Sequence, residues 1–258
     1  MTIAALAVAF FVTAFLYSSV GFGGGSTYNA LLALGVADIS TVPVVALTCN
    51  ILVVAIGSWR FVRDGHVELQ RLWPLVIFSV PSALLGGYLR VPAWLFVGLL
   101  ALALGVSGLL MLWQPLWRHE RERQAHQSNR AVDLASGGAL GLLAGVTGIG
   151  GGIYLAPSLH LRRWASARTI AGTCAAFILV NSIGGLLGQL LKSGAGATFA
   201  MIRMDWSLFP AVVLGGLLGS TLGSLKFDSD ILRVLTALLV LYAAVRLGVR
   251  FPGEWANR

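Results

Sequence analysis

Long apolar runs separated by short charged gaps dominate the chain. Stretches free of Asp, Glu, Lys and Arg cover residues 1–37, 39–59, 72–89, 91–117, 134–161, 169–191 and 206–225, with a shorter one at 234–245. A helix needs about 20 apolar residues to cross a bilayer. The runs are continuous and do not alternate as barrel strands do. The pattern therefore predicts an all-α integral membrane protein with about eight transmembrane helices.

The eight predicted spans cover residues 3–34, 40–60, 72–89, 93–113, 132–160, 168–191, 206–224 and 230–249. Composition agrees, since 57% of the residues are hydrophobic and only 11% are charged, against roughly 25% charged in a soluble domain. The formal net charge of +8 comes mostly from gap residues, which favours contact with lipid headgroups over nucleic acid. We expect no cofactor and no metal, because the two cysteines have no metal-site spacing.

Lysine and arginine are unevenly distributed among the gaps. The gaps after the second, fourth and sixth spans and the C-terminal segment together hold 12 of them, and the gaps on the other side hold 6. Cytoplasmic loops carry an excess of these residues. The sequence thus predicts a multi-pass protein of the cell inner (plasma) membrane, with both termini and the 114–130 linker in the cytoplasm.

An internal repeat is visible. Gly21-Phe22-Gly23-Gly24-Gly25 in the first run matches Gly148-Ile149-Gly150-Gly151-Gly152 in the fifth, and Thr48-Cys49 matches Thr173-Cys174. We therefore expect a first membrane repeat over 1–113, a linker at 114–130 and a second repeat over 131–258. Four spans per half is an even number, so both halves should enter the membrane from the same side and form a parallel repeat.

The two glycine-rich segments should break their helices. Glycine costs roughly 1 kcal/mol relative to alanine in a helix interior, and broken backbone at membrane depth occurs only where protein or a water-filled cavity satisfies it. The start of the following half-helix attracts anions. The alternative is close helix packing, which we adopt for two other stripes at four-residue spacing: Gly137, Gly141 and Gly145, and Gly215, Gly219 and Gly223.

Polar side chains within the spans complete the candidate site. An amide or hydroxyl in a bilayer should face the bundle interior, although an interhelical hydrogen bond of roughly 0.6 kcal/mol explains each one alone equally well. Ser26 is placed to cap the second half-helix. The candidate substrate-binding residues are Gly21, Gly23, Gly24, Gly25, Ser26, Thr48, Asn50, Gly148, Gly150, Gly151, Gly152, Thr173 and Asn181. Carboxylates lie only near span ends, so we assign no catalytic residue.

These features resemble the sulfite exporter TauE/SafE family of membrane permeases. The resemblance rests on the paired glycine motifs, Trp59-Arg60-Phe61, Gly65-His66, the Thr173…Asn181-Ser182 spacing and the four-plus-four layout. It implies transport of small sulfur-containing anions such as sulfite or organosulfonates. One departure is that Ile56 stands eight residues after Thr48, where the second half has Asn181 after Thr173. We therefore expect an asymmetric site that relies more on Asn181 than on Asn50.

The sequence thus predicts a secondary transporter, an exporter, that holds its anion between the two glycine-rich breaks and works by alternating access. A proton or a sodium ion is the candidate coupling ion, and a homo-oligomer is left open. An anion channel on the same breaks is the main alternative. An enzyme lacks the His/Asp/Glu cluster that a metal or general base requires, and a purely structural scaffold does not explain the repeated break.

Overall fold

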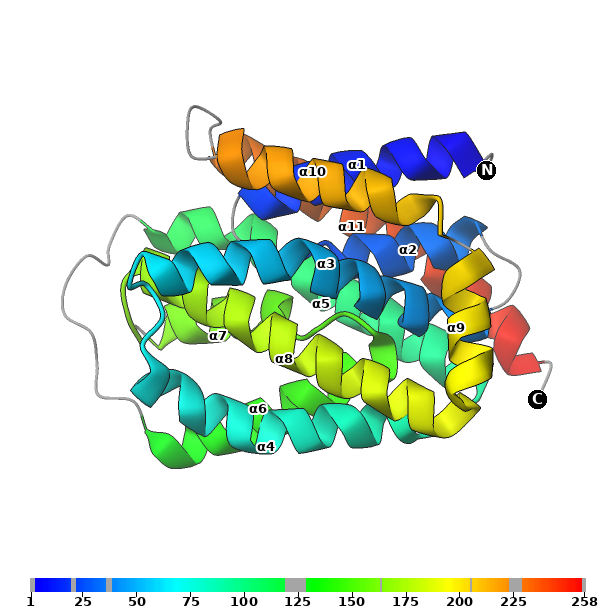
Figure 1. The fold of residues 1–258 in the computed structure, drawn as a ribbon, viewed down its shortest axis with the longest axis horizontal. Coiled ribbons are helices and arrows are strands. Elements are labelled where there is room, and N and C mark those ends of the chain that lie inside the picture. Colours follow the sequence, from blue (N-terminus) through cyan, green and yellow to red (C-terminus); the bar gives the residue numbers. More distant parts are fainter. Residues whose placement is uncertain are drawn as a thin grey trace.

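The computed structural model describes residues 3–19, 22–35, 39–118, 129–162, 164–204, 206–222 and 229–256, and the regular elements in these ranges are helical (Figure 1). They are α1 (Ile3–Ser19), α2 (Gly25–Gly35), the 3₁₀ turn η1 (Ile39–Thr41), α3 (Val42–Arg63), α4 (Leu69–Tyr88), α5 (Ala93–Arg118), α6 (Arg130–Thr147), α7 (Gly152–Leu161), α8 (Ala167–Ser193), α9 (Ala195–Met204), α10 (Leu208–Leu222) and α11 (Ser229–Ala256). The all-α class is confirmed. Helix α9 was not expected, because its ten residues fall in a gap between predicted spans.

Within the described residues, four stretches of helix are long and apolar enough to cross a membrane: Val42–Arg63, Leu69–Tyr88, Ala93–Leu110 and Arg168–Ser193. Shorter apolar helical stretches cover Ile3–Ser19, Leu208–Thr221 and Val240–Val249. The chain is thus consistent with a multi-pass membrane protein, and the number of eight spans stays a prediction.

Helices α1 and α2 form an antiparallel hairpin. The Tyr17 hydroxyl, near the end of α1, lies 3.1 Å from Ser26 Oγ and 2.9 Å from Thr27 Oγ1 at the start of α2. Further from the turn, the rings of Phe10 and Tyr28 stack with centroids 4.8 Å apart. Position numbers fall along α1 as they rise along α2, so the chain turns back on itself at the first glycine-rich segment.

Helices α6 and α7 form the second hairpin. Near its turn, Gly151 packs on Ala144, and at its open end Arg162 forms an ion pair of 2.6 Å with Asp133. Helix α6 ends at Thr147 and α7 begins at Gly152, so the second glycine-rich segment also turns the chain back toward its starting end.

The hairpins correct the predicted parallel repeat. A hairpin returns the chain to the end from which it came, so each half carries the chain across the bundle an odd number of times. In Figure 1 the N and C marks lie at one end, together with the junction of α4 and α5, whereas α5 ends and α6 begins at the other end. We call these the terminal end and the linker end. Termini and linker therefore lie at opposite ends, and the two hairpins enter the bundle in opposite directions.

Contacts between the halves repeat when the halves are exchanged. Helix α1 packs on α10 as α6 packs on α4, and α3 contacts α10 as α8 contacts α4. The pairs α3 with α8 and α5 with α11 join equivalent helices directly. An inverted two-fold repeat would produce this pattern. It supports the division into repeats 1–113 and 131–258, which stays a prediction; residues 119–128 of the linker lie outside the described residues.

Both glycine stripes bring helix backbones into direct contact, as predicted. A Cβ atom at Gly137, Gly141 or Gly145 of α6 would collide with the carbonyl oxygens of Leu75, Ser79 and Ala83 of α4, respectively. Gly215 and Gly219 of α10 sit in the same way on the carbonyl oxygens of Phe11 and Phe15 of α1. Gly223 lies outside the described residues. The two pairs of parallel helices are thus held by the same small-residue geometry.

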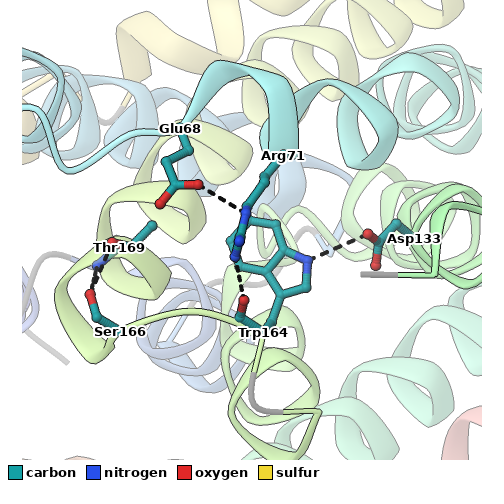
Figure 2. Close-up of polar contacts among 6 residues, drawn as sticks. All are labelled: Glu68, Arg71, Asp133, Trp164, Ser166 and Thr169. Carbon is teal, nitrogen blue, oxygen red and sulfur yellow. Dashed lines mark hydrogen bonds and ion pairs between the residues drawn. The ribbon is translucent and has the colours of Figure 1, made fainter. Parts of the chain in front are cut away.

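A polar network fixes the open end of the α6–α7 hairpin to α4 and α8 (Figure 2). Asp133, only 1% exposed, pairs with Arg162 and accepts a 3.4 Å hydrogen bond from Trp164 Nε1. The Trp164 carbonyl accepts from Arg71 at 2.5 Å, and the Arg71 guanidinium lies 5.4 Å from the Trp164 ring centroid. Arg71 also pairs with Glu68 at 2.9 Å.

Trp164 is therefore a buried connector, 1% exposed, although a tryptophan just beyond the end of a predicted span is typical of a membrane-interface anchor. Trp59, Trp73, Trp113 and Trp206 are exposed, as membrane-interface anchors require. Two residues after Trp164, Ser166 caps the N-terminus of α8: its hydroxyl oxygen accepts a hydrogen bond of 3.3 Å from the Thr169 N–H.

The glycine packing predicts that Gly141→Ala destabilises the protein by about 1–3 kcal/mol, because the new methyl group must push α4 away. Gly138→Ala is the matched control on the same helix, since its Cβ would make ordinary contacts at 3.6 Å with Phe78 and 3.7 Å with Ser82. Thermal unfolding of both variants in detergent measures the difference. Equal stability of the two would contradict backbone contact at Gly141.

The hairpin topology predicts that Asn129→Cys and Gly196→Cys face opposite sides of the membrane. Both positions are exposed and lie at the linker end and terminal end, respectively, while Cys49 and Cys174 are buried. A membrane-impermeant maleimide should label one variant only in right-side-out vesicles and the other only in inverted vesicles. Labelling of both from the same side would restore the parallel repeat.

Candidate functional site

The turns of the two hairpins meet inside the bundle at Asn50 of α3. The Asn50 Nδ2 group donates a hydrogen bond of 3.0 Å to the carbonyl oxygen of Ile149, in the second glycine-rich segment. On its other side, Asn50 lies against Gly23 and Gly25 of the first segment, where a Cβ atom at either glycine would overlap its amide. A Cβ atom at Gly25 would also lie 2.6 Å from the Ile149 carbonyl oxygen. One amide therefore joins segments that are more than 120 residues apart in sequence.

The two segments need glycine for different reasons. In the first, close approach decides, because a Cβ atom at Gly24 would come within 2.6 Å of the Tyr28 ring. In the second, Gly148, Gly150 and Gly151 have φ angles of +73°, +82° and +79°, a region that other residues rarely adopt. Gly21 lies outside the described residues.

Each turn ends in a helix N-terminus that lies inside the bundle. Helix α2 begins at Gly25 and α7 at Gly152. The first N–H groups of a helix have no partner within it and carry a partial positive charge. The bonds that start these helices run from Tyr28 N–H to the Gly24 carbonyl and from Leu155 N–H to the Gly151 carbonyl. Two half-helices that enter from opposite ends thus bring their positive ends into one region.

Several fully buried polar atoms near these turns lack a hydrogen-bond partner among the described residues. They include Asn50 Oδ1, Ser182 Oγ, Tyr28 Oη and Asn29 Oδ1, on residues that are 0% exposed. Thr173 Oγ1 of α8 is likewise unpaired on a residue that is 0% exposed. Ser182 and Asn50 both line Gly150, because a Cβ atom there would lie 3.0 Å from Ser182 Oγ and 3.0 Å from Asn50 Nδ2. An unpaired buried polar group costs about 1–3 kcal/mol. A ligand that bonds to these groups would remove that cost.

Other predicted site residues already have partners. The Asn181 amide donates to the Phe177 carbonyl at 2.9 Å and accepts from Ser79 Oγ, so it links α8 to α4. Thr48 Oγ1 donates to the Val44 carbonyl at 2.8 Å. Ser26 lies in the first turn of α2 and bonds to Tyr17, so the predicted cap at Ser26 is wrong.

The expectation that Asn181 matters more than Asn50 is therefore not what the contacts favour. Asn50 touches both glycine-rich segments and keeps an unpaired oxygen, whereas both ends of the Asn181 amide are used. Sequence reasoning also omitted Ser182 from the site. Its position beside Asn181 was visible, but no sequence signal says which of two neighbouring polar residues points toward the turns.

The side chains nearest to the described glycines of both turns carry no charge. The nearest side chains beside the glycines of these segments come from Asn50, Val54, Tyr28, Thr13, Pro43, Ile178, Ser182, Phe177 and Ala144. Arg60, near the end of α3, donates to the Ser220 carbonyl. Within the described ranges, no group of three or more His, Cys, Asp or Glu residues is placed to hold a metal ion.

Comparisons with known proteins agree with the sequence pattern. The family model described as "Sulfite exporter TauE/SafE" matches residues 5–247. The "Probable membrane transporter protein y4hK" of Sinorhizobium fredii (strain NBRC 101917 / NGR234) is 32% identical over 243 residues, which cover 94% of this chain and 96% of the relative. No solved structure matches the chain.

Proposed function

The chain belongs to the sulfite exporter TauE/SafE family, so it is a membrane transporter and not an enzyme, and we propose that it is a secondary transporter that exports small sulfur-containing anions. Sulfite and organosulfonates are the substrate class. The anion binds where the α1–α2 and α6–α7 turns meet, and alternating access moves it across the membrane. The protein is surrounded by the lipid bilayer. A proton or a sodium ion stays the candidate coupling ion.

One observation carries this proposal: two half-helix N-termini converge on unpaired, fully buried polar groups of α3 and α8. Helix starts favour negative charge, and broken helices that meet near the bilayer midplane are the usual binding sites of transporters with inverted repeats. Among the predicted site residues, Gly23, Gly25, Asn50, Gly150 and Gly152 lie at this junction. We add Ser182 to the binding site. We assign Asn181 and Thr48 a structural role, as residues that support the helices around it.

The opposite entry of the two hairpins supports alternating access. A site between two inverted elements is exposed to one side when one element moves and to the other side when its counterpart moves. The two hairpins meet at Asn50, through its bond to the Ile149 carbonyl and the approach of Gly25. Each hairpin would move about this contact together with the helix on which it is packed, α10 for α1 and α4 for α6, so the glycine contacts stay intact.

The topology changes the proposed orientation. Helix ends at the linker end carry Arg63 (end of α3), Arg71 (start of α4), Arg130 (start of α6), Arg162 (after α7) and Arg168 (start of α8). Arg90 (after α4), Lys192 (end of α8) and Arg246 (second half of α11) lie toward the terminal end. We therefore propose that the linker end faces the cytoplasm in the inner membrane. Both termini then face the other side, in place of the cytoplasmic termini expected from a parallel repeat.

Transport is tested with purified protein in liposomes that take up labelled sulfite. Saturable uptake that sulfonates compete away, and that a trans load of substrate accelerates, would establish a carrier. Uptake without trans-acceleration would favour an anion channel. No uptake of any sulfur anion by folded protein would overturn the proposed substrate class.

We predict that Gly25→Ala lowers sulfite uptake at least tenfold, because the added methyl group overlaps the Asn50 amide and lies 2.6 Å from the Ile149 carbonyl. Gly25→Leu and Gly152→Leu should abolish uptake. Gly57→Ala in α3 is the control, since its Cβ meets nothing within 4 Å, and it should transport normally. Unchanged uptake by the folded Gly25 and Gly152 variants would place the site elsewhere.

A further inference from the structure

The orientation of the Asn50 amide is fixed by its partner. A carbonyl oxygen only accepts hydrogen bonds, so the Asn50 atom 3.0 Å from Ile149 O must be the NH₂ group. The other end of the amide is therefore an oxygen. This Oδ1 atom is buried, has no partner among the described residues and faces Gly23, where a Cβ atom would lie 2.6 Å from it.

The junction thus presents two kinds of group to a ligand. Asn50 Oδ1 only accepts and needs a ligand that donates a proton into a hydrogen bond. Ser182 Oγ and the first-turn N–H groups of α2 and α7 donate, and they suit the oxygens of an anion. An oxyanion without a proton would place a lone pair against Asn50 Oδ1 and leave that acceptor unpaired.

The charge at the junction favours a ligand with a single negative charge. Each helix N-terminus is equivalent to about half a positive charge, so the two half-helices supply about one in total. The side chains nearest to the described glycines of both turns are neutral. A monoanion is therefore balanced, whereas a dianion would keep an uncompensated charge in a low-dielectric region, which is costly.

Resting on the proposed function, we propose that this site binds a singly charged oxyanion that retains one proton, such as hydrogen sulfite, and rejects the sulfite and sulfate dianions. Asn50 Oδ1 accepts from the ligand's own proton. Ser182 and the α2 and α7 N-termini hold the anionic oxygens.

The test measures ligand binding to the purified full-length protein in detergent. Binding is read from the rise in unfolding temperature, across a pH series at constant total sulfite. Above the pKa at which hydrogen sulfite loses its proton, its concentration falls about tenfold per pH unit. The apparent affinity for total sulfite should fall in parallel. Methanesulfonate is a monoanion without a transferable proton at every pH used, so its binding reports any effect of pH on the protein itself.

We expect hydrogen sulfite to bind at least tenfold more tightly than methanesulfonate, because a hydrogen bond to an otherwise unpaired buried group separates them, and sulfate to compete weakly. Asn50→Leu should abolish the preference over methanesulfonate. Ser182→Ala should weaken both anions and retain the preference, which keeps the test available if the Asn50 variant does not fold.

Affinity for total sulfite that rises with pH, or equal binding of sulfate, would overturn the inference. So would a preference for hydrogen sulfite that survives in folded Asn50→Leu. Binding with these selectivities but without liposome flux would leave the inference standing and overturn the transport function. Liposome flux that rises with the concentration of the sulfite dianion would support the transport function and overturn the inference.

Discussion

Backbone groups that are released from a helix inside a membrane protein must find partners within the protein, because the hydrocarbon offers none. Two such interruptions lie in this bundle, and they are placed against one another. Asn50 reaches from α3 to the Ile149 carbonyl and contacts the first turn through Gly23 and Gly25. The hairpin directions, the convergence of two helix N-termini and the buried unpaired groups all depend on this one junction.

Backbone packing ties each hairpin to a neighbouring helix. Helices α6 and α10 sit on the carbonyl oxygens of α4 and α1 through glycines at four-residue spacing, and such contacts leave little freedom to slide. The Asp133–Trp164–Arg71 network ties the open end of the second hairpin to the start of α4. Charged groups therefore bond at the end of the bundle, and the centre is left to neutral donors and acceptors.

A neutral centre has consequences for transport. A buried arginine would hold an anion tightly, whereas helix dipoles and hydroxyl groups balance a single charge without introducing a fixed one. The empty site then carries no fixed charge during the return step. It also makes the protonation state of the ligand matter, because the count of charges and of hydrogen-bond donors changes together when an oxyanion loses a proton.

The sequence by itself determined the helical membrane class, the family and the location of both glycine-rich turns, because apolar run length and three adjacent glycines act locally. It also predicted the packing stripes, since four-residue spacing places residues on one helix face. Only the tertiary structure decided that each turn is a hairpin, which reverses the parity of the halves and separates the termini from the linker. It alone distinguished Asn50 and Ser182, which keep unpaired atoms, from Asn181, whose amide is used by Ser79 and Phe177. The physical reason is that a hydrogen-bond partner on another helix is set by packing between distant segments, which residue identity and spacing along one chain do not encode.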